Sequence, residues 1–400
     1  MGTYCRRGFR ATRSAFLVRL AFFSTIVSYP WGGADTLWTN AAETACARGD
    51  QLLIFVSTAV AGHPRIAALA GCGAKVVILD PPTPPPSLRF RFLRKLGLAR
   101  YPDTGLIAAL RSFQPDLVVF SQGGTYDLVE LPRLTTWLRA RRIKYRIIAN
   151  WQQERPQLDA TDIACIRKTF AAADSINFVS TRNLTVTRRH LAVPLANARV
   201  IQNPLRWQPA DVAPWPAGPV ARLATVSRLD PSKGIHLLLQ ALANAGTALP
   251  DWQLNIFGQG PEEARFRETA AHLGLGDRVQ FRGYVKELRA IWAANHLMIS
   301  PALDDGVPMT IPEAMLCQRP VLATAVGGAE DWLRDNETGF ICFAPTLPLL
   351  TATLERALAA RDRWTAMGQA AAAAAQAHYQ PNDYLTLLRG QQQRRKRDKP

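Results

Sequence analysis

Two positively charged residues stand five positions apart in a loop that directly follows a predicted strand. The segment reads Ser227-Arg-Leu-Asp-Pro-Ser-Lys-Gly234 and carries Arg228 and Lys233. A doubly wound sheet binds its ligand at the carboxyl ends of its parallel strands. Each cation would form a charge-assisted hydrogen bond of roughly 1.5 to 3 kcal/mol with a phosphate. The segment therefore predicts an anion site, with a surface loop of solvated charges as the alternative.

A second loop combines two carboxylates with a predicted helix start. Residues 300–315 read Ser-Pro-Ala-Leu-Asp-Asp-Gly-Val-Pro-Met-Thr-Ile-Pro-Glu-Ala-Met. A helix that opens near Thr310 would turn its first backbone amides toward an anion. Asp305 and Glu313 lie eight positions apart, and carboxylates suit the paired hydroxyls of a sugar or a ribose. For Glu313 the alternative is a stabilising charge at the helix N-terminus.

Two glycine-rich turns follow other predicted strands. The turn Phe257-Gly-Gln-Gly-Pro-Glu262 lacks the third glycine of a dinucleotide-binding fingerprint. The carboxylate of Glu262 at the helix start would also repel a pyrophosphate, which favours a packing turn over an NAD site. The pair Gly327-Gly328 lets backbone approach a ligand or only closes a turn.

Short apolar or β-branched runs alternate with longer helical patterns along most of the chain, which is typical of parallel βαβ units. In the first half the predicted strands are 18–27, 51–57, 75–79, 116–120, 145–149 and 176–179. In the second half they are 223–226, 254–257, 279–281, 297–300, 320–323 and 339–342. The sequence therefore predicts an α/β protein with two doubly wound, Rossmann-like domains in tandem.

A proline cluster marks the predicted domain boundary. Residues 207–219 contain four prolines and follow Asn203-Pro204, which indicates an interdomain linker. The predicted domains are 1–205 and 206–375, with a closing helix and a basic tail in 376–400. The apolar stretch from Ala15 to Val27 imitates a signal peptide, but Arg19 interrupts it and no cleavage site follows, so we expect a core strand at 18–27.

The net charge of +17 is unevenly distributed. Residues 1–14 carry +4, residues 15–205 carry +11, residues 206–390 carry −2 and the last ten carry +4. The excess indicates an anionic partner, but no RNA- or DNA-binding module is recognisable, so nucleic acid is not expected. The six cysteines form no CxxC motif and fit reduced thiols of a cytosolic protein better than disulfides or a zinc site.

Taken in order, the segments from Leu223 to Phe340 resemble the carboxyl-terminal domain of the GT4 family of GT-B glycosyltransferases, a retaining group that uses nucleotide-diphosphate sugars. The resemblance rests on the Arg228 to Lys233 loop, Gly-Gln-Gly-Pro-Glu262, Asp277-Arg-Val-Gln-Phe-Arg-Gly-Tyr-Val285, Asp305-Gly-Val-Pro with Pro312-Glu-Ala-Met315, Gly327-Gly328 and Thr338-Gly339-Phe340. In the first half, Gly32-Gly33-Ala-Asp35 resembles the family's glycine loop. The resemblance implies a cleft between the two domains and a C-terminal helix that crosses back onto the first domain.

The resemblance also implies roles for single positions. Arg228 and Lys233 would neutralise the donor diphosphate as it leaves. Asp305 would bind hydroxyls of the donor sugar, and Glu313 would hold the ribose. These four residues are the catalytic candidates. The further donor-binding candidates are Gly32, Gly33, Gly283, Val285, Gly306, Val307, Pro308, Met309 and Thr310.

The chain departs from the family pattern in its acids and histidines. The family usually has Glu where Asp305 and Asp331 stand. It often has histidines after first-domain strands, where this chain has Phe120-Ser-Gln-Gly-Gly124 and Asn150-Trp-Gln-Gln153. We therefore name no general base, since in a retaining transfer the leaving phosphate can take the acceptor's proton. No Asp-x-Asp motif occurs, so neither a metal nor another cofactor is expected.

The acceptor side is predicted from scattered residues. Its candidates are Asp35, Gln122, Asn150 and Trp151. Cations alternate with large apolar residues at 89–98, and a second basic cluster spans 139–146. The candidates for contact with an anionic membrane surface, at about 1 kcal/mol per basic residue, are Arg89, Arg91, Arg94 and Lys95. The alternative is a solvated cationic face; in either case the excess charge of the first half is expected on the acceptor side.

The sequence thus predicts a metal-independent retaining glycosyltransferase. It would move a sugar from a UDP- or GDP-sugar donor to a saccharide or lipid-linked saccharide, in polysaccharide or glycolipid biosynthesis. We expect it in the cytoplasm, with peripheral contact to the inner face of the cytoplasmic membrane. The alternatives are another GT-B activity, such as a phosphorylase or a nucleotide-sugar epimerase, and a non-catalytic nucleotide-sugar or glycan binder.

Overall fold

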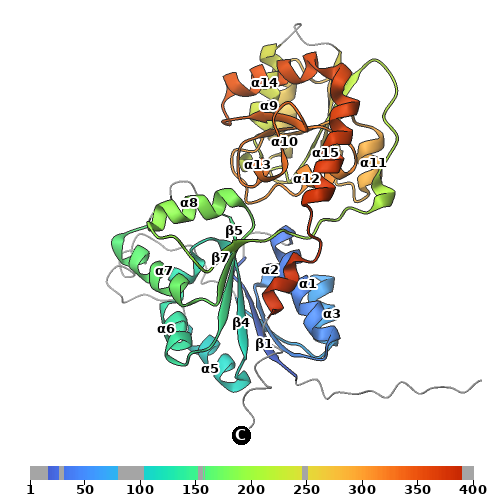
Figure 1. Ribbon diagram of the computed structural model, residues 1–400. Coiled ribbons are helices and arrows are strands. Elements are labelled where there is room, and N and C mark those ends of the chain that lie inside the picture. The colour runs from blue at the N-terminus through green and yellow to red at the C-terminus, as the bar shows by residue number, and fades with distance from the viewer. Residues whose placement is uncertain are drawn as a thin grey trace, which may run out of the picture.

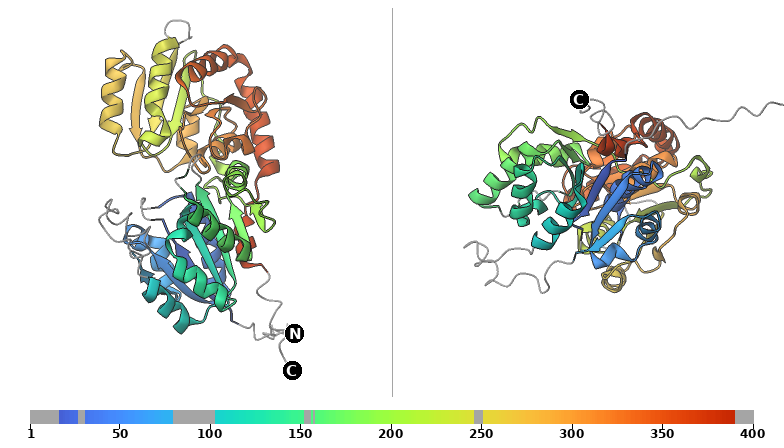
Figure 2. Two further views of the ribbon diagram at one scale, coloured as in Figure 1. Left: turned by 90° about the vertical axis from the view of Figure 1, so that its left-hand side faces the viewer. Right: turned by 90° about the horizontal axis from the view of Figure 1, so that it is seen from below.

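Two parallel sheets organise the protein, and each has helices on both faces (Figure 1, Figure 2). The computed structural model describes residues 17–26, 31–79, 103–151, 156, 158–245 and 251–389. Both sheets follow the alternation of strand and helix that the sequence predicts. The predicted α/β class with two Rossmann-like domains is therefore confirmed.

The first sheet has the strand order β3-β2-β1-β4-β5-β6-β7 within the described residues. Its strands are β1 (Arg19–Ser24), β2 (Gln51–Val56), β3 (Lys75–Ile78), β4 (Leu117–Gly124), β5 (Tyr145–Trp151), β6 (Ser175–Phe178) and β7 (Ala198–Val200). The elements around it are α1 (Gly33–Ala47), α2 (Thr58–Ala61), α3 (Pro64–Gly71), α5 (Asp103–Phe113), the 3-10 turn η1 (Asp127–Glu130), α6 (Pro132–Ala140), α7 (Ala160–Ala172) and α8 (Thr181–Leu191). The order reverses between β1 and β4, and this is the switch point where such sheets bind ligands.

The second sheet repeats this topology with the order β10-β9-β8-β11-β12-β13. Its strands are β8 (Ala221–Val226), β9 (Trp252–Phe257), β10 (Val279–Gly283), β11 (Leu297–Ser300), β12 (Val321–Thr324) and β13 (Gly339–Cys342). The helices and turns of this half are η2 (Pro209–Asp211), η3 (Pro231–Lys233), α9 (Ile235–Ala245), α10 (Glu263–His272), α11 (Leu288–Ala293), α12 (Thr310–Leu316), α13 (Ala329–Trp332), α14 (Leu347–Ala359), η5 (Arg361–Arg363), α15 (Trp364–His378) and η6 (Asp383–Leu388). Here the switch point lies between β8 and β11.

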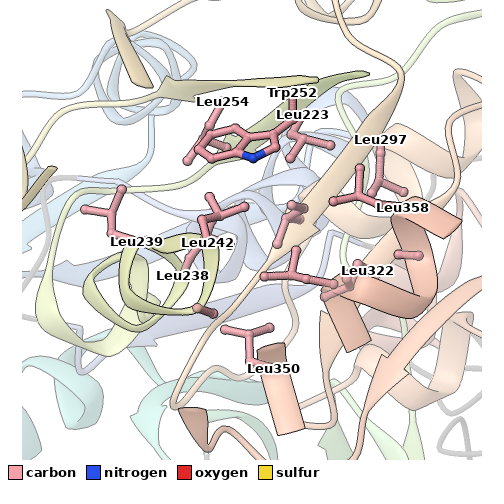
Figure 3. Close-up of a cluster of buried hydrophobic side chains, with 14 of the residues drawn as sticks. Leu223, Leu238, Leu239, Leu242, Trp252, Leu254, Leu297, Leu322, Leu350 and Leu358 are labelled. Atoms are coloured by element: carbon pink, nitrogen blue, oxygen red, sulfur yellow. The ribbon is translucent and has the colours of Figure 1, made fainter. Parts of the chain in front are cut away.

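Leucine-rich helix faces pack on the second sheet to form one of the cores (Figure 3). Helix α9 contributes Leu238, Leu239 and Leu242, which lie against Leu223 and Leu254 of the strands. All five side chains are at most 1% exposed. Burying a leucine stabilises the fold by roughly 2 kcal/mol, so this core holds the strand ends of the second domain in fixed positions.

Every predicted strand is present, with ends that differ by a few residues. The segment at 18–27 contributes β1, whose Leu20 and Phe22 are 1% exposed, so it is a core strand as expected. The short edge strand β7 was not predicted, because its Ala-Arg-Val sequence shows no apolar run. No helix among the described residues is long and apolar enough to span a membrane.

The segment that crosses back onto the first domain differs from the predicted helix. Helix α15 ends at His378, and Pro381 follows, which cannot donate the hydrogen bonds that would continue the helix. The 3-10 turn η6 then packs on α1, where Leu387 and Leu388 join the core of the first domain (Figure 1). The predicted crossover is present, but its last part is the short 3-10 helix η6 and not a continuation of the α-helix.

One residue of the predicted basic cluster at 139–146 serves this crossover instead of a surface. Arg146 is 7% exposed, and its guanidinium donates to Asp174 at 2.7 Å and to the carbonyls of Thr386 and Arg389 at 2.8 and 2.7 Å. Arg141 and Arg142 are exposed but lie just before β5, at the amino end of the sheet. Residues 89–98 lie outside the described residues.

Candidate active site

A cavity of about 660 Å³ lies between the two domains, at the carboxyl ends of both sheets. It brings together eleven residues that the sequence singles out. These are Gly32, Gly33, Asp35, Asn150, Trp151, Arg228, Lys233, Asp305, Gly306, Val307 and Met309. Six other candidates are not part of its lining, namely Gln122, Gly283, Val285, Pro308, Thr310 and Glu313. Arg89, Arg91, Arg94 and Lys95 lie outside the described residues.

The two predicted cations follow β8 and face the cavity, each beside a carboxylate. The guanidinium of Arg228 donates to Asp230 at 2.6 Å, and Lys233 Nζ lies 2.7 Å from Asp305 Oδ2. Burial by itself would raise the pKa of Asp230, but hydrogen bonds from Ser232 and Arg228 outweigh it and lower that pKa. The carboxylates hold both cations in place, at positions where an anionic ligand would compete for them.

The Gly-Gln-Gly turn supports the loop of Arg228. A Cβ on Gly258 would collide with the carbonyl of Ser227, and a Cβ on Gly260 with the carbonyl of Leu229. Gly258 also has a φ of +133°, which side chains rarely adopt. The glycines are therefore required for close packing against the loop.

The loop of Asp305 approaches the first domain just as closely. Gly306 packs on the carbonyl of Asn150. Gly33 at the start of α1 lies close to Met309, because a Cβ built on this glycine would be 3.2 Å from Met309 Cγ. Trp151 Nε1 donates to Asp304 Oδ1 at 2.8 Å, which adds a polar link between the domains. The two walls of the cavity are thus in direct contact around its rim.

Glu313 lies in the first turn of α12, apart from Asp305, and is 2% exposed. Its carboxylate accepts from the guanidinium of Arg206 at 3.0 and 3.1 Å and from the Arg206 backbone N–H at 3.3 Å. Arg206 belongs to the interdomain linker and was not a sequence candidate. No local pattern points to this partner, because it lies 107 positions away.

Two predicted acceptor residues have structural partners. The Gln122 side chain accepts from the N–H of Leu128 at 2.8 Å and donates to the carbonyl of Thr125 at 3.0 Å. Asp35 is 1% exposed and accepts from the Gly32 N–H at 3.0 Å, so it caps α1 while lining the cavity. Burial raises the pKa of Asp35 to about 6, although hydrogen bonds from Trp38 and Gly32 oppose the shift.

The first-domain wall contains groups that the sequence interpretation missed. Asp127 and Glu130 of η1 line the cavity, and so does Asn203, in addition to the predicted Asn150. Burial raises the pKa of Asp127 to about 6, and a hydrogen bond from Thr25 opposes the shift. The available signal was that both acids follow the predicted strand at 116–120, on the side of the sheet where ligands bind.

This wall corrects the expected placement of charge. No Lys or Arg of the first half lines the cavity in the described part of the chain. The exposed cations Arg141 and Arg142 of the 139–146 cluster lie between α6 and β5, at the opposite, amino end of the strands. The described part of the wall facing the second domain is therefore acidic, although residues 15–205 have a net charge of +11. Among the described residues no three His, Cys, Asp or Glu side chains cluster as a metal site would require.

Two Rossmann-like domains around such a cavity define the GT-B fold. HepE from Anabaena, solved in complex with UDP, superposes with a TM-score of 0.68 at 17% identity, over 92% of this chain and 97% of that one. Residues 218–374 match the family model for "Glycosyl transferases group 1". The second domain is therefore a group 1 glycosyltransferase domain, while the narrower GT4 assignment stays a prediction.

Curated relatives match a part of the chain as well. A GDP-mannose-dependent phosphatidylinositol monomannoside mannosyltransferase of Mycolicibacterium smegmatis is 33% identical over 36% of this chain and 40% of its own length. One of the human phosphatidylinositol N-acetylglucosaminyltransferase subunits is 31% identical over 34% of this chain and 28% of its own. The matches thus span less than half of these relatives.

Proposed function

We propose that this protein is a retaining glycosyltransferase that moves a sugar from a nucleotide-diphosphate sugar to a saccharide or lipid-linked saccharide. The observation that carries the proposal is the pair Arg228 and Lys233 in the interdomain cavity, opposite the glycine loop at Gly32 and Gly33. The group 1 domain at 218–374 supports a nucleotide-sugar donor. The UDP in HepE and the GDP-mannose in the name of the mycobacterial relative support a UDP- or GDP-sugar.

In the proposed reaction the donor diphosphate displaces the carboxylates that now hold the two cations. Arg228 and Lys233 then stabilise the negative charge that develops as the nucleotide diphosphate leaves, which is the kind of term that dominates much of catalysis. Asp305, released from Lys233, accepts hydrogen bonds from hydroxyls of the donor sugar. The bond between the anomeric carbon and the diphosphate oxygen breaks in this step.

The acceptor oxygen attacks the same face of the sugar from which the diphosphate departs. Its proton moves to the leaving phosphate oxygen, so the configuration is retained and no protein base is needed. The chain has no Asp-x-Asp motif, which supports a reaction without a bridging metal. Glu313 would hold the ribose, and Gly283 to Val285 would contact the base.

The names of the relatives also guide the acceptor. Both curated relatives act on phosphatidylinositol or its glycosides by name, which supports a role in glycolipid or polysaccharide biosynthesis. We place the protein at the cytoplasmic face of a membrane, with residues 89–95 as the surface contact. Co-sedimentation with anionic liposomes that weakens when these residues are neutralised would support the placement, and unchanged sedimentation would refute it.

A panel of UDP- and GDP-sugars with a membrane extract as acceptor tests the activity through nucleotide release. We expect release with one donor, and loss of at least a thousandfold in turnover when Arg228→Ala and Lys233→Ala are combined. The matched control removes two exposed cations of the same domain, Arg265→Ala and Arg334→Ala, and should keep full activity. Activity in the first double variant would overturn the phosphate assignment.

Negative results also discriminate between the alternatives. Binding without release from any donor favours a nucleotide-sugar or glycan binder. Release of a sugar phosphate that requires inorganic phosphate favours a phosphorylase, and conversion of the sugar without an acceptor favours an epimerase.

A further inference from the structure

The first-domain wall of the cavity presents carboxylates beside a second opening. Asp127 and Glu130 line the cavity of about 660 Å³ and also a neighbouring one of about 790 Å³. The second cavity is lined further by Tyr126, Leu158 and Asn183. The two carboxylates lie where the cavities meet, opposite the cations of the second domain.

A chain of neutral donors holds Asp127 in place. The Gly123 N–H donates to Thr25 Oγ1 at 3.0 Å, the Thr25 hydroxyl donates to Asp127 Oδ2, and the Gly124 N–H donates to the same oxygen at 3.1 Å. Gln122 fixes the turn that carries Asp127. No cation pairs with Asp127 in the part of the chain that the structure describes. A carboxylate offers about four acceptor positions, so these neutral donors leave Asp127 with capacity for a ligand.

Two buried amides add to this capacity. Asn150 is 7% exposed and Asn203 is 8% exposed, and both line the same cavity. The Oδ1 atom of each is buried and has no hydrogen-bond partner among the described residues. An unsatisfied buried acceptor costs about 1 to 3 kcal/mol, which a ligand hydroxyl or ammonium group would offset.

Apolar side chains complete the wall. Phe23, Ile26, Leu79, Leu106 and Leu131 line the cavity on the side of Asp127. They come from the ends of β1 and β3, from α5 and from the residue before α6. A ligand that fills this part of the cavity must therefore combine hydrogen-bond donors with an apolar group.

We infer that this wall is the acceptor subsite, and that it takes a hydroxylated or aminated ring without negative charge, linked directly to an apolar group. The inference rests on the proposed function and specifies its acceptor. Asp127 and the two amides accept hydrogen bonds from the ring, and the apolar side chains contact the group attached to it. A phosphate or carboxylate next to Asp127 is repelled by its carboxylate, which among the described residues is held by neutral donors alone.

Binding of octyl glycosides tests the subsite without requiring turnover. The probes are octyl glucoside, galactoside, mannoside and 2-amino-2-deoxyglucoside, each below its critical micelle concentration, and octyl glucuronide as an anionic match. Saturation-transfer NMR and calorimetry should show binding of at least one uncharged or aminated probe, at least about tenfold tighter than the glucuronide. Binding of none of them, or equal binding of the glucuronide, would overturn the inference.

Variants of the carboxylate separate recognition from folding. Asp127→Asn should weaken binding of the preferred probe about tenfold. It should also reduce the difference in affinity between that probe and the glucuronide, because the negative charge is removed. Nucleotide binding and the unfolding temperature should stay close to those of the unchanged protein. Asp277→Asn, at an exposed loop of the second domain, is the matched control. An unchanged preference in Asp127→Asn would refute the role of this residue.

The apolar part has its own pair of variants. Leu79→Gln should weaken octyl glycoside binding about tenfold, whereas Ile78→Gln, at the adjacent 57% exposed position, should not. Equal effects of the two variants on octyl glycoside binding would refute the contact between the apolar side chains and the octyl group. The two proposals can fail separately. If the variants change probe binding but no donor is turned over, the subsite stands and the proposed enzyme activity is refuted. If a donor is turned over but probe binding does not respond to the variants, the activity stands and the subsite is refuted.

Discussion

The two walls of the interdomain cavity are built in different ways. The second-domain wall carries Arg228, Lys233 and Asp305, which come from two short loops that follow β8 and β11. The first-domain wall takes single residues from separate elements, such as Thr25 after β1, Asp127 in η1 and Asn203 before the linker. Side chains from one continuous loop leave a readable motif in the sequence, and dispersed ones do not.

The walls also differ in charge, and each wall has the opposite sign of charge to the domain that builds it. Residues 206–390 have a net charge of −2 but contribute Arg228 and Lys233 to the cavity, while residues 15–205 have +11 and contribute carboxylates within the described part of the chain. Net charge reports on the whole surface, whereas a site depends on a few side chains at the strand ends. This division assigns the anionic donor to one wall and a hydrogen-bond-donating acceptor to the other.

The contact between the walls is the most sensitive point of this arrangement. In Gly306→Ala the new methyl group would overlap the carbonyl of Asn150, so the loop of Asp305 must shift away from the first domain. Because a displacement of about 1 Å is enough to cost a hundredfold in rate, we expect transfer to fall a hundredfold or more. Steady-state nucleotide release measures the effect.

The control for this variant is Gly276→Ala, because a Cβ built on Gly276 has no neighbour within 4 Å. It should keep its activity, and nucleotide binding to the second domain should persist in both variants. Equal rates for the two alanine variants would show that the walls need not touch for catalysis, and would contradict the comparison.

The linker provides the next test, since it joins the two domains and its Arg206 pairs with Glu313 of the second domain. Arg206→Gln leaves the buried Glu313 carboxylate without its cation, and we expect the free energy of unfolding to fall by about 2.5 kcal/mol. The side chain of Arg206 is 42% exposed, so this lies below the range for a fully buried pair. Urea denaturation of both single variants and of Arg206→Gln with Glu313→Gln gives the coupling energy.

An exposed pair on the same domain is the reference. Arg267 and Glu263 lie 2.8 Å apart on the surface of α10, and their coupling should be no more than about 0.5 kcal/mol. Additive effects at Arg206 and Glu313 would mean that the carboxylate finds another donor, and that the linker does not stabilise the second domain through this pair.

The fold was largely predictable, because parallel strands buried on both faces leave continuous apolar runs such as Leu52 to Val56. The predictions failed where tertiary contacts or a helix-breaking residue decide the structure. Edge strand β7 has only three residues and an exposed Arg199, and the expected crossover helix is interrupted around Pro381 before the 3-10 helix η6 begins. Neither outcome follows from local periodicity.

The site was predictable on one wall only. Arg228 and Lys233 were found because a loop after a strand fixes where they point, even before any contact is known. The pairing of Glu313 with Arg206 joins residues 107 positions apart, and the free oxygens of Asn150 and Asn203 become visible only when burial is known. Asp127 lies three residues after Gly124, close enough to the end of β4 to have been considered.

Asp35 provides the mildest test, because it lines the first wall and also caps α1. Its pKa of about 6 in the folded protein lies above the ordinary value of 3.8, so the folded state binds the proton more tightly than the unfolded chain does. This stabilisation is full below pH 4 and is lost as the pH rises from about 4 to about 6. The side chain of the Asn variant does not titrate. As the pH rises over that range, the unchanged protein should therefore lose roughly 2 kcal/mol of unfolding free energy relative to the variant. Urea denaturation at pH 4, 5, 6 and 7 measures the difference, with Asp277→Asn as control. Parallel curves would show that Asp35 titrates normally, as a solvated carboxylate of the acceptor wall would, and not as a buried helix cap.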